Sequence, residues 1–177
     1  MELSLTDVIA RIRLIPDYPV PGVLFRDITP LIADARSFDL LTSHLGTSHS
    51  DYNLVSGIEA RGFILGAAIA QKFNKGFIPL RKKGKLPYTT ISKSYGLEYG
   101  EDVIEAHVDA ANADDRVLLV DDVLATGGTI IAALELFEEL GSTITEVVVL
   151  LEISELGGRE KIERKFPGIK LRALHIV

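Results

Sequence analysis

Residues 117–129 read VLLVDDVLATGGT. The first four are continuously apolar, which is typical of a strand buried on both faces of a sheet. Two carboxylates, Asp121 and Asp122, follow the strand directly, and a loop with two glycines then leads into a helix predicted over residues 128–140. Strand, glycine loop and helix in this order indicate one unit of a parallel α/β sheet.

Segments on either side fit the same architecture. Short apolar runs predict strands at residues 54–58, 76–80, 116–120, 146–152 and 169–177. Helical spacing predicts helices over residues 4–14, 36–45, 61–73 and 128–140, with a short one beginning at 157–161. Ser4 and Asp7 are expected to cap the first helix, Gly141 to end the fourth, and the prolines between Pro16 and Gly22 to hold an extended loop. The predicted fold is α/β, with a central, mostly parallel sheet flanked by helices and ligands bound at the carboxyl ends of the strands.

Composition narrows the functional classes. The chain has 177 residues, 47% of them hydrophobic and 25% charged, which suits one globular domain over residues 1–177. Nineteen basic and 25 acidic residues give a net charge of −6, which argues against a nucleic-acid partner. The absence of cysteine excludes disulfides and thiol chemistry. No apolar run reaches membrane-spanning length and the four histidines form no metal-binding pattern, so we expect a soluble cytoplasmic protein with no membrane partner and no metal held by its own side chains.

The loop after the central strand has the features of a phosphate site. The small residues Ala125, Gly127 and Gly128 allow close approach of a ligand, the hydroxyls of Thr126 and Thr129 flank them, and the following helix N-terminus favours an anion. The two preceding carboxylates suit the paired hydroxyls of a ribose. The residues therefore predict a ribose 5-phosphate site, whereas the nucleotide motifs G-x-x-x-x-G-K-[ST] and G-x-G-x-x-G are both missing.

Two further features point to anions. Arg61 lies at a predicted helix start, where the helix dipole disfavours a cation unless an anionic ligand is present. The run RKKGK at residues 81–85 places four cations within five positions of an acidic chain. It opens a polar stretch, residues 81–102, that we read as a long functional loop or an irregular hairpin.

Residues 117–129 closely resemble the phosphoribosyl-pyrophosphate signature of the type I phosphoribosyltransferases. Five further segments resemble the adenine phosphoribosyltransferases in particular: PGVLFRDITPLI at 21–32, SGIEARGF at 56–63, PLRKKGKLP at 79–87, SYGLEYGED at 94–102 and ELGGREK at 155–161. The resemblance implies the type I phosphoribosyltransferase fold, with an N-terminal hood over roughly residues 1–32 and a flexible loop over roughly residues 81–102. It also implies transfer of 5-phosphoribosyl from phosphoribosyl pyrophosphate to adenine, giving AMP and pyrophosphate in purine salvage.

The resemblance assigns residues to each part of the substrates. In the hood, Phe25 would stack on adenine, and the backbones of Leu24 and Arg26 would read its edge. The ribose 5-phosphate site would comprise Asp121, Asp122, Ala125, Thr126, Gly127, Gly128 and Thr129. The pyrophosphate site would comprise Glu59, Ala60, Arg61, Arg81, Lys82 and Lys85, with a cis peptide expected between Glu59 and Ala60.

Catalysis is assigned by the same resemblance. Glu98 would act in proton transfer at the purine, Tyr99 would shield the site, and Arg61 would stabilise the departing pyrophosphate. Mg²⁺ is implied as a cofactor held mainly through substrate oxygens, and a homodimer is implied as the assembly.

Two alternatives stay open on the sequence. One is a phosphoribosyltransferase for another base, such as xanthine, guanine or orotate. The other is a non-catalytic regulator that senses phosphoribosyl pyrophosphate, although such regulators usually carry a DNA-binding domain and no basic recognition helix is found here. Gly96 and the glycine-free turn at residues 110–115 depart from the family pattern outside the assigned contacts.

Overall fold

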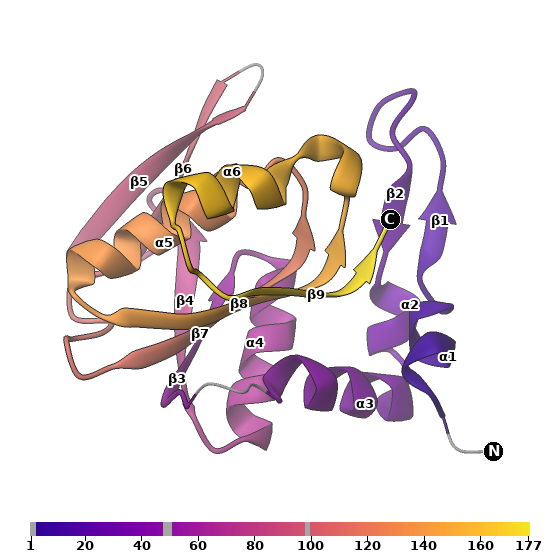
Figure 1. Ribbon diagram of the computed structural model, residues 1–177, viewed down its shortest axis with the longest axis horizontal. Coiled ribbons are helices and arrows are strands. Elements are labelled where there is room, and N and C mark those ends of the chain that lie inside the picture. Colours follow the sequence, from indigo (N-terminus) through magenta and orange to yellow (C-terminus); the bar gives the residue numbers. More distant parts are fainter. Residues whose placement is uncertain (1–2, 48–50, 98–99) are drawn as a thin grey trace. The chain divides into compact units, whose positions relative to one another are not determined.

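A seven-stranded sheet forms the centre of the larger part of the structure, a computed structural model that describes residues 3–47, 51–97 and 100–177 (Figure 1). Its strands are β3 (Leu54–Ile58), β4 (Gly76–Lys82), β5 (Thr90–Leu97), β6 (Gly100–His107), β7 (Arg116–Leu124), β8 (Thr143–Glu152) and β9 (Leu171–Ile176). They lie in the order β5-β6-β4-β3-β7-β8-β9. The five strands from β4 to β9 are parallel, and β5 and β6 join antiparallel at the β4 edge.

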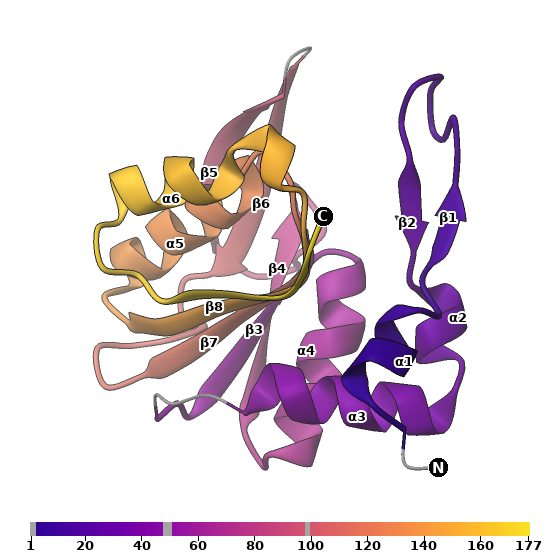
Figure 2. The same cartoon turned by 45° about the vertical axis from the view of Figure 1, so that its right-hand side comes forward.

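Helices lie on both faces of this sheet. Helix α4 (Arg61–Lys72) covers one face, and α5 (Gly128–Leu140) and α6 (Gly158–Lys165) cover the other (Figure 2). Because the central strands are covered on both sides, they are apolar almost throughout, as in Val117–Val120, where every residue is fully buried. The mostly parallel α/β architecture predicted from the sequence is confirmed.

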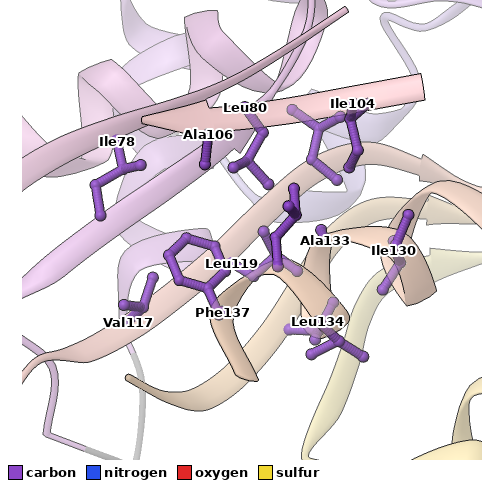
Figure 3. Close-up of a cluster of buried hydrophobic side chains, with 14 of the residues drawn as sticks. Ile78, Leu80, Ile104, Ala106, Val117, Leu119, Ile130, Ala133, Leu134 and Phe137 are labelled. Carbon is purple, nitrogen blue, oxygen red and sulfur yellow. The ribbon is translucent and has the colours of Figure 1, made fainter. Parts of the chain in front are cut away.

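The core lies between the sheet and α5. Side chains from β4, β6, β7 and α5 meet there (Figure 3), and they include Ile78, Leu80, Ile104, Leu119, Leu134 and Phe137. Phe137 is fully buried and is the largest of these side chains. This packing fixes α5 against the sheet, so that its N-terminus is held beside the carboxyl end of β7.

Residues 1–44 and residues 45–177 form two compact units. In the first, β1 (Arg13–Ile15) and β2 (Phe25–Asp27) form a two-stranded antiparallel sheet. It also contains α1 (Leu5–Ile9) and α2 (Thr29–Ile32), while α3 (Ala35–Gly46) reaches the second unit. Of the described residues, no helix is long and apolar enough to cross a membrane.

The N-terminal helix is shorter than predicted. Ser4 and Asp7 form the expected capping box, with the Ser4 side chain accepting from the Asp7 N–H and the Asp7 carboxylate accepting from the Ser4 N–H. The helix nevertheless ends at Ile9, because residues 13–15 pair with residues 25–27 as a strand. Pairing with a distant segment outweighs the local helical spacing that predicted a helix over 4–14.

The segment read as a long loop or irregular hairpin is a regular hairpin. Strand β5 pairs with β6 without interruption from Thr90↔His107 to Leu97↔Gly100. From Ile91 to residue 96, partly buried and exposed residues alternate along β5. Ile91 and Tyr95 are on the partly buried face and pack against the core. Serine, lysine and glycine residues between the inward-facing positions hid this alternation in the sequence. Strand β4 also differs from its prediction, because it continues to Lys82 rather than ending at residue 80.

Several predicted boundaries hold closely and others shift. The strand at 54–58 and the helix at 128–140 match β3 and α5, and Gly141 ends α5 with a φ of 78°. The central strand runs to Leu124 instead of 120, so Asp121 and Asp122 lie within β7. β8 begins earlier than predicted, at Thr143.

Truncation of the core aromatic should weaken the fold strongly. Replacing Phe137 by Ala removes a fully buried ring between α5 and the sheet, and we expect the free energy of unfolding to fall by about 3–5 kcal/mol. Urea denaturation followed by circular dichroism measures this loss. Phe137→Leu, which keeps most of the volume, should lose much less, and equal losses in both variants would contradict this packing role.

Candidate functional site

A pocket of about 250 Å³ opens in the larger unit at the carboxyl ends of β3 and β7. Its walls are the ends of these two strands, the turns that follow them and the start of α5. The lining residues are Ile58, Glu59, Ala60, Arg61, Lys82, Tyr95, Asp121, Asp122, Val123, Leu124, Ala125, Thr126, Gly127, Gly128, Thr129 and Ile130. The structure thus brings together the predicted ribose 5-phosphate residues and four of the predicted pyrophosphate residues.

The glycine loop forms the end of the pocket nearest α5. Gly127 is the residue before α5 and has a φ of 80°, a left-handed conformation that glycine adopts without steric cost. Its carbonyl accepts a hydrogen bond from Ile131, 2.9 Å away, which begins the helix. The N–H groups of the first helical turn have no partner within the helix, so they and the helix dipole provide an anion site at Gly128 and Thr129.

The two carboxylates lie at the floor of the pocket. Asp122 is 5% exposed, and its Oδ2 is 2.6 Å from Arg61 Nε. Asp121 Oδ1 accepts a hydrogen bond of 2.9 Å from the Asp122 N–H. Burial raises the pKa of Asp121 well above its ordinary value, and the neighbouring Asp122 carboxylate raises it further. Burial also raises the pKa of Asp122, although Arg61 opposes this rise.

A glycine brings α4 close to these carboxylates. A Cβ at Gly62 would lie 3.0 Å from Asp121 Oδ1 and 3.0 Å from the carbonyl oxygen of Val120. The second residue of α4 therefore lies close to the backbone of β7, in a contact that any side chain would crowd. This contact places Arg61, the first residue of the helix, beside Asp122.

The turn after β3 contains the cis peptide expected between Glu59 and Ala60. The Glu59 carboxylate accepts hydrogen bonds from the Lys82 N–H at 2.9 Å and from the Lys85 ammonium, and it pairs with Arg81 at 3.4 Å. Burial raises the pKa of Glu59, but these cationic and N–H donors outweigh it and hold the pKa below its ordinary value. The turn is thereby linked to the basic run at 81–85.

The basic run divides into two groups. Lys82 lines the pocket, whereas Arg81 and Lys85 lie outside the lining and pair with Glu59. Contact of Arg81 and Lys85 with pyrophosphate stays a prediction.

Tyr95 is a lining residue that the sequence analysis missed. Its hydroxyl donates to Asp102 Oδ2 at 2.9 Å and accepts from Lys82 Nζ at 3.2 Å. Lys82 also forms an ion pair with Asp102. The hairpin of β5 and β6 therefore holds the pocket lysine from two sides. Recognition of residues 90–97 as an alternating strand would have placed Tyr95 on the inward face.

The remaining predicted residues lie elsewhere. Leu24 precedes β2, and Phe25 and Arg26 belong to it, in the unit of residues 1–44. The Phe25 ring has an edge-to-face contact with Tyr18, with centroids 5.1 Å apart. Their contact with adenine stays a prediction. Glu98 and Tyr99 lie outside the described residues.

The pocket carboxylates Asp121 and Asp122 are donors that could share a Mg²⁺ ion with a phosphorylated substrate. Within residues 3–47, 51–97 and 100–177, no three His, Asp or Glu side chains are grouped in a way that could hold a metal ion. Mg²⁺ commonly binds through one or two carboxylates together with substrate phosphates and waters. The pair Asp121 and Asp122 beside an anion site fits that mode.

The site as a whole combines three chemical properties. The loop and helix start offer N–H donors that suit a phosphate, the carboxylates can accept hydrogen bonds from hydroxyls, and Arg61 and Lys82 supply positive charge in the same pocket. Such a constellation suits a sugar phosphate with a second anionic group.

Comparison with known proteins gives the class first. The family model of the phosphoribosyl transferase domain matches residues 43–168, which include the pocket and every strand of the seven-stranded sheet except β9.

Individual relatives then narrow the class. An adenine phosphoribosyltransferase of Rhodopseudomonas palustris is 52% identical over 98% of this chain and 88% of its own length. The crystal structure of adenine phosphoribosyltransferase from Thermoanaerobacter pseudethanolicus has a TM-score of 0.92 and 41% identity, covering 98% of this chain and 100% of its own. The enzyme from Saccharomyces cerevisiae, solved with adenine and an imino-altritol bisphosphate, has a TM-score of 0.88 and 32% identity over 96% and 97% of the two chains. The chain belongs to the adenine phosphoribosyltransferases.

Neutralising one buried carboxylate should stabilise the fold. A group whose pKa is raised by folding costs stability once the pH exceeds its ordinary value, 3.8 for Asp121, and the full cost is present above the raised value. Asp121→Asn removes this cost and keeps an oxygen to accept the Asp122 N–H, so we expect about 0.5–2 kcal/mol of added stability at pH 7.

Denaturation as a function of pH measures this gain. The difference between the variant and the natural chain should shrink as the pH falls through the raised pKa towards 3.8. Asp109→Asn, at an exposed position, is the matched control and should change little. A loss of stability in Asp121→Asn at pH 7 would contradict the assignment.

Proposed function

We propose that the chain transfers the 5-phosphoribosyl group of phosphoribosyl pyrophosphate to adenine, giving AMP and pyrophosphate. The observation that carries the proposal is the pocket, in which a glycine loop at a helix start, two buried carboxylates and the Arg61 guanidinium converge. Its relatives named adenine phosphoribosyltransferase support the choice of adenine as acceptor.

The glycine loop and the carboxylates hold the ribose 5-phosphate. The first N–H groups of α5 and the hydroxyls of Thr126 and Thr129 surround the 5-phosphate. Asp121 and Asp122 accept hydrogen bonds from the two ribose hydroxyls. Their negative charge also favours the oxocarbenium-like sugar that forms as the bond to pyrophosphate breaks.

The pyrophosphate leaves towards the turn at residues 59–61. Arg61 is held there by Asp122, and Lys82 by Tyr95 and Asp102, so both cations are in place before the substrate binds. They stabilise the negative charge that grows on the departing group. When bound through substrate oxygens, Mg²⁺ supplies further positive charge to the same group.

Adenine is read by the unit of residues 1–44. Phe25 stacks on the purine, while the backbones of Leu24 and Arg26 supply a donor and an acceptor for its edge. Hypoxanthine and guanine present the opposite donor and acceptor pattern, so their binding leaves buried polar groups unpaired. Glu98 moves the proton at the purine and Tyr99 helps to exclude water. A homodimer and a cytoplasmic location stay predictions of the family resemblance.

The activity is tested by pyrophosphate release. With Mg²⁺ and phosphoribosyl pyrophosphate present, we expect release with adenine, and at least about a hundredfold less with hypoxanthine, guanine, xanthine or orotate at equal concentration. Glu98→Ala should lower the rate with adenine if this glutamate moves the proton. Release with another base alone would assign a different acceptor, and binding of phosphoribosyl pyrophosphate without turnover of any base would favour a regulator.

Loss of one carboxylate charge should impair the sugar substrate. Asp122→Asn removes both a hydroxyl acceptor and the partner of Arg61, so we expect kcat/KM for phosphoribosyl pyrophosphate to fall by about a hundredfold with the fold intact. Steady-state kinetics at saturating adenine and a thermal melt measure the two properties. Asp114→Asn, at an exposed position, is the control; unchanged kinetics in Asp122→Asn would remove its assigned role.

A further inference from the structure

We propose that Gly158, the first residue of α6, is a positioning residue that holds the phosphate loop in its binding conformation. The inference rests on the proposed function, because it concerns the loop assigned to the 5-phosphate. Gly158 belongs to the segment ELGGREK at residues 155–161, to which the proposed reaction assigns no role. It does not line the pocket itself.

Gly158 packs directly behind the loop. A Cβ built on Gly158 would lie 2.2 Å from the carbonyl oxygen of Ala125 and 2.9 Å from the backbone nitrogen of Gly127. In the other direction, a Cβ on Gly127 would lie 2.8 Å from the carbonyl oxygen of Gly158. The two backbones therefore touch with no side chain between them, and neither contact involves a flexible group that could yield.

The atoms in this contact determine the direction in which the N–H donors of the loop point. Gly127 has a positive φ and precedes α5, and its N–H is one of the donors at the helix start. The Ala125 carbonyl lies two residues earlier in the same loop. A methyl group at position 158 would push on both atoms and turn the loop donors away from the phosphate. Gly158 thus acts on the ligand through the loop.

An ion pair between the partly exposed Arg159 and the buried Glu152 fixes the other side of this contact. Arg159 Nε donates to Glu152 Oε1 at 2.9 Å, and Arg159 Nη1 donates to the carbonyl of Leu171 at 3.0 Å. Glu152 is 4% exposed and pairs with Leu124 in the sheet, next to the phosphate loop. Hydrogen bonding to Glu152 raises the pKa of Arg159.

Gly158 is therefore the contact point between the start of α6 and the loop after β7. Arg159 fastens the first turn of α6 to the end of β8 and to β9, and the end of β7 leads into the loop. The Ile153 N–H donates to the Leu124 carbonyl at 2.9 Å and so joins the residue after β8 to the end of β7. If α6 moved away from the sheet, Gly158 would no longer pack against the loop. Arg159 and Glu152 therefore affect phosphate binding indirectly, by holding α6 in place.

Direct binding tests the role of Gly158. In calorimetric titrations without turnover, we expect Gly158→Ala to bind AMP and ribose 5-phosphate at least about tenfold more weakly than the natural chain, because displaced groups lose much of their effect. Binding of pyrophosphate should stay within about twofold, since its proposed site at residues 59–61 does not touch Gly158. General damage to the fold would weaken all three ligands alike.

A matched control separates this effect from loss of glycine in the same region. Gly168 has a φ of 86° and nothing within 4 Å of a built Cβ, so Gly168→Ala strains the backbone without a clash. This variant should lose stability and keep its affinity for AMP. Arg159→Lys, which keeps the charge but not the paired geometry, should weaken AMP binding in the same direction as Gly158→Ala by about threefold, and it serves if Gly158→Ala does not fold.

The outcomes are distinct. Weaker binding of AMP and ribose 5-phosphate with unchanged pyrophosphate binding supports the role of Gly158. Natural affinity for AMP in Gly158→Ala and in Arg159→Lys would overturn it while leaving the proposed function in place. Equal loss of all three ligands would also overturn it, because the effect would not be specific to the loop. If the natural chain bound neither AMP nor ribose 5-phosphate, the proposed function would fail and the inference with it.

Discussion

Two adjacent carboxylates are buried near the end of the central strand. The electrostatic cost of burying them side by side organises the site around them. Burial disfavours the ionised forms of Asp121 and Asp122, and the Asp122 carboxylate raises the pKa of Asp121 further. Arg61 and a backbone N–H offset part of that cost. A ligand that brings hydroxyl donors, a developing positive charge or a divalent cation offsets more of it. A ligand that relieves this electrostatic cost therefore gains binding free energy over a ligand that does not.

Close backbone contacts, rather than side chains, bring the elements of the site together. Gly62 lets the start of α4 approach Asp121, and Gly127 and Gly158 let the phosphate loop rest on the start of α6. Each contact replaces a side-chain layer, so the start of α4 lies directly against β7 and the start of α6 directly against the loop that follows it. The apolar core beneath, which fixes α5 through residues such as Phe137, then sets where the helix N-terminus points. Binding groups contributed by the backbone also have no rotamers to fix when the phosphate arrives.

The sequence predicts the parts of this structure in which local pattern and tertiary environment agree. β3 and α5 match their predicted bounds, because a continuously apolar strand and a helix closed by Gly141 leave little ambiguity. The family motifs, in turn, predict eleven of the sixteen residues that line the pocket. The sequence fails where pairing partners are distant: α1 stops at Ile9 because residues 13–15 join β2, and the polar alternation of β5 conceals Tyr95. The support that Gly158 gives to the loop depends on a backbone contact over thirty residues away, which no local pattern records.

Charge balance around the pocket explains how an acidic chain can receive a polyanion. The net charge is −6, yet the cations nearest the pocket are each held by a carboxylate: Arg61 by Asp122, and Lys82 by Asp102. Such pairing holds the long side chains in place before binding, so less of their conformational entropy remains to be lost. The lowered pKa of Glu59 keeps that carboxylate ionised. The ionised carboxylate in turn keeps its ion pairs with Arg81 and Lys85. A single monoanion gains little against these built-in partners. In the proposed reaction, a pyrophosphate has several oxygens and is accompanied by a divalent cation, so it would compete with these carboxylates far better than simple phosphate would.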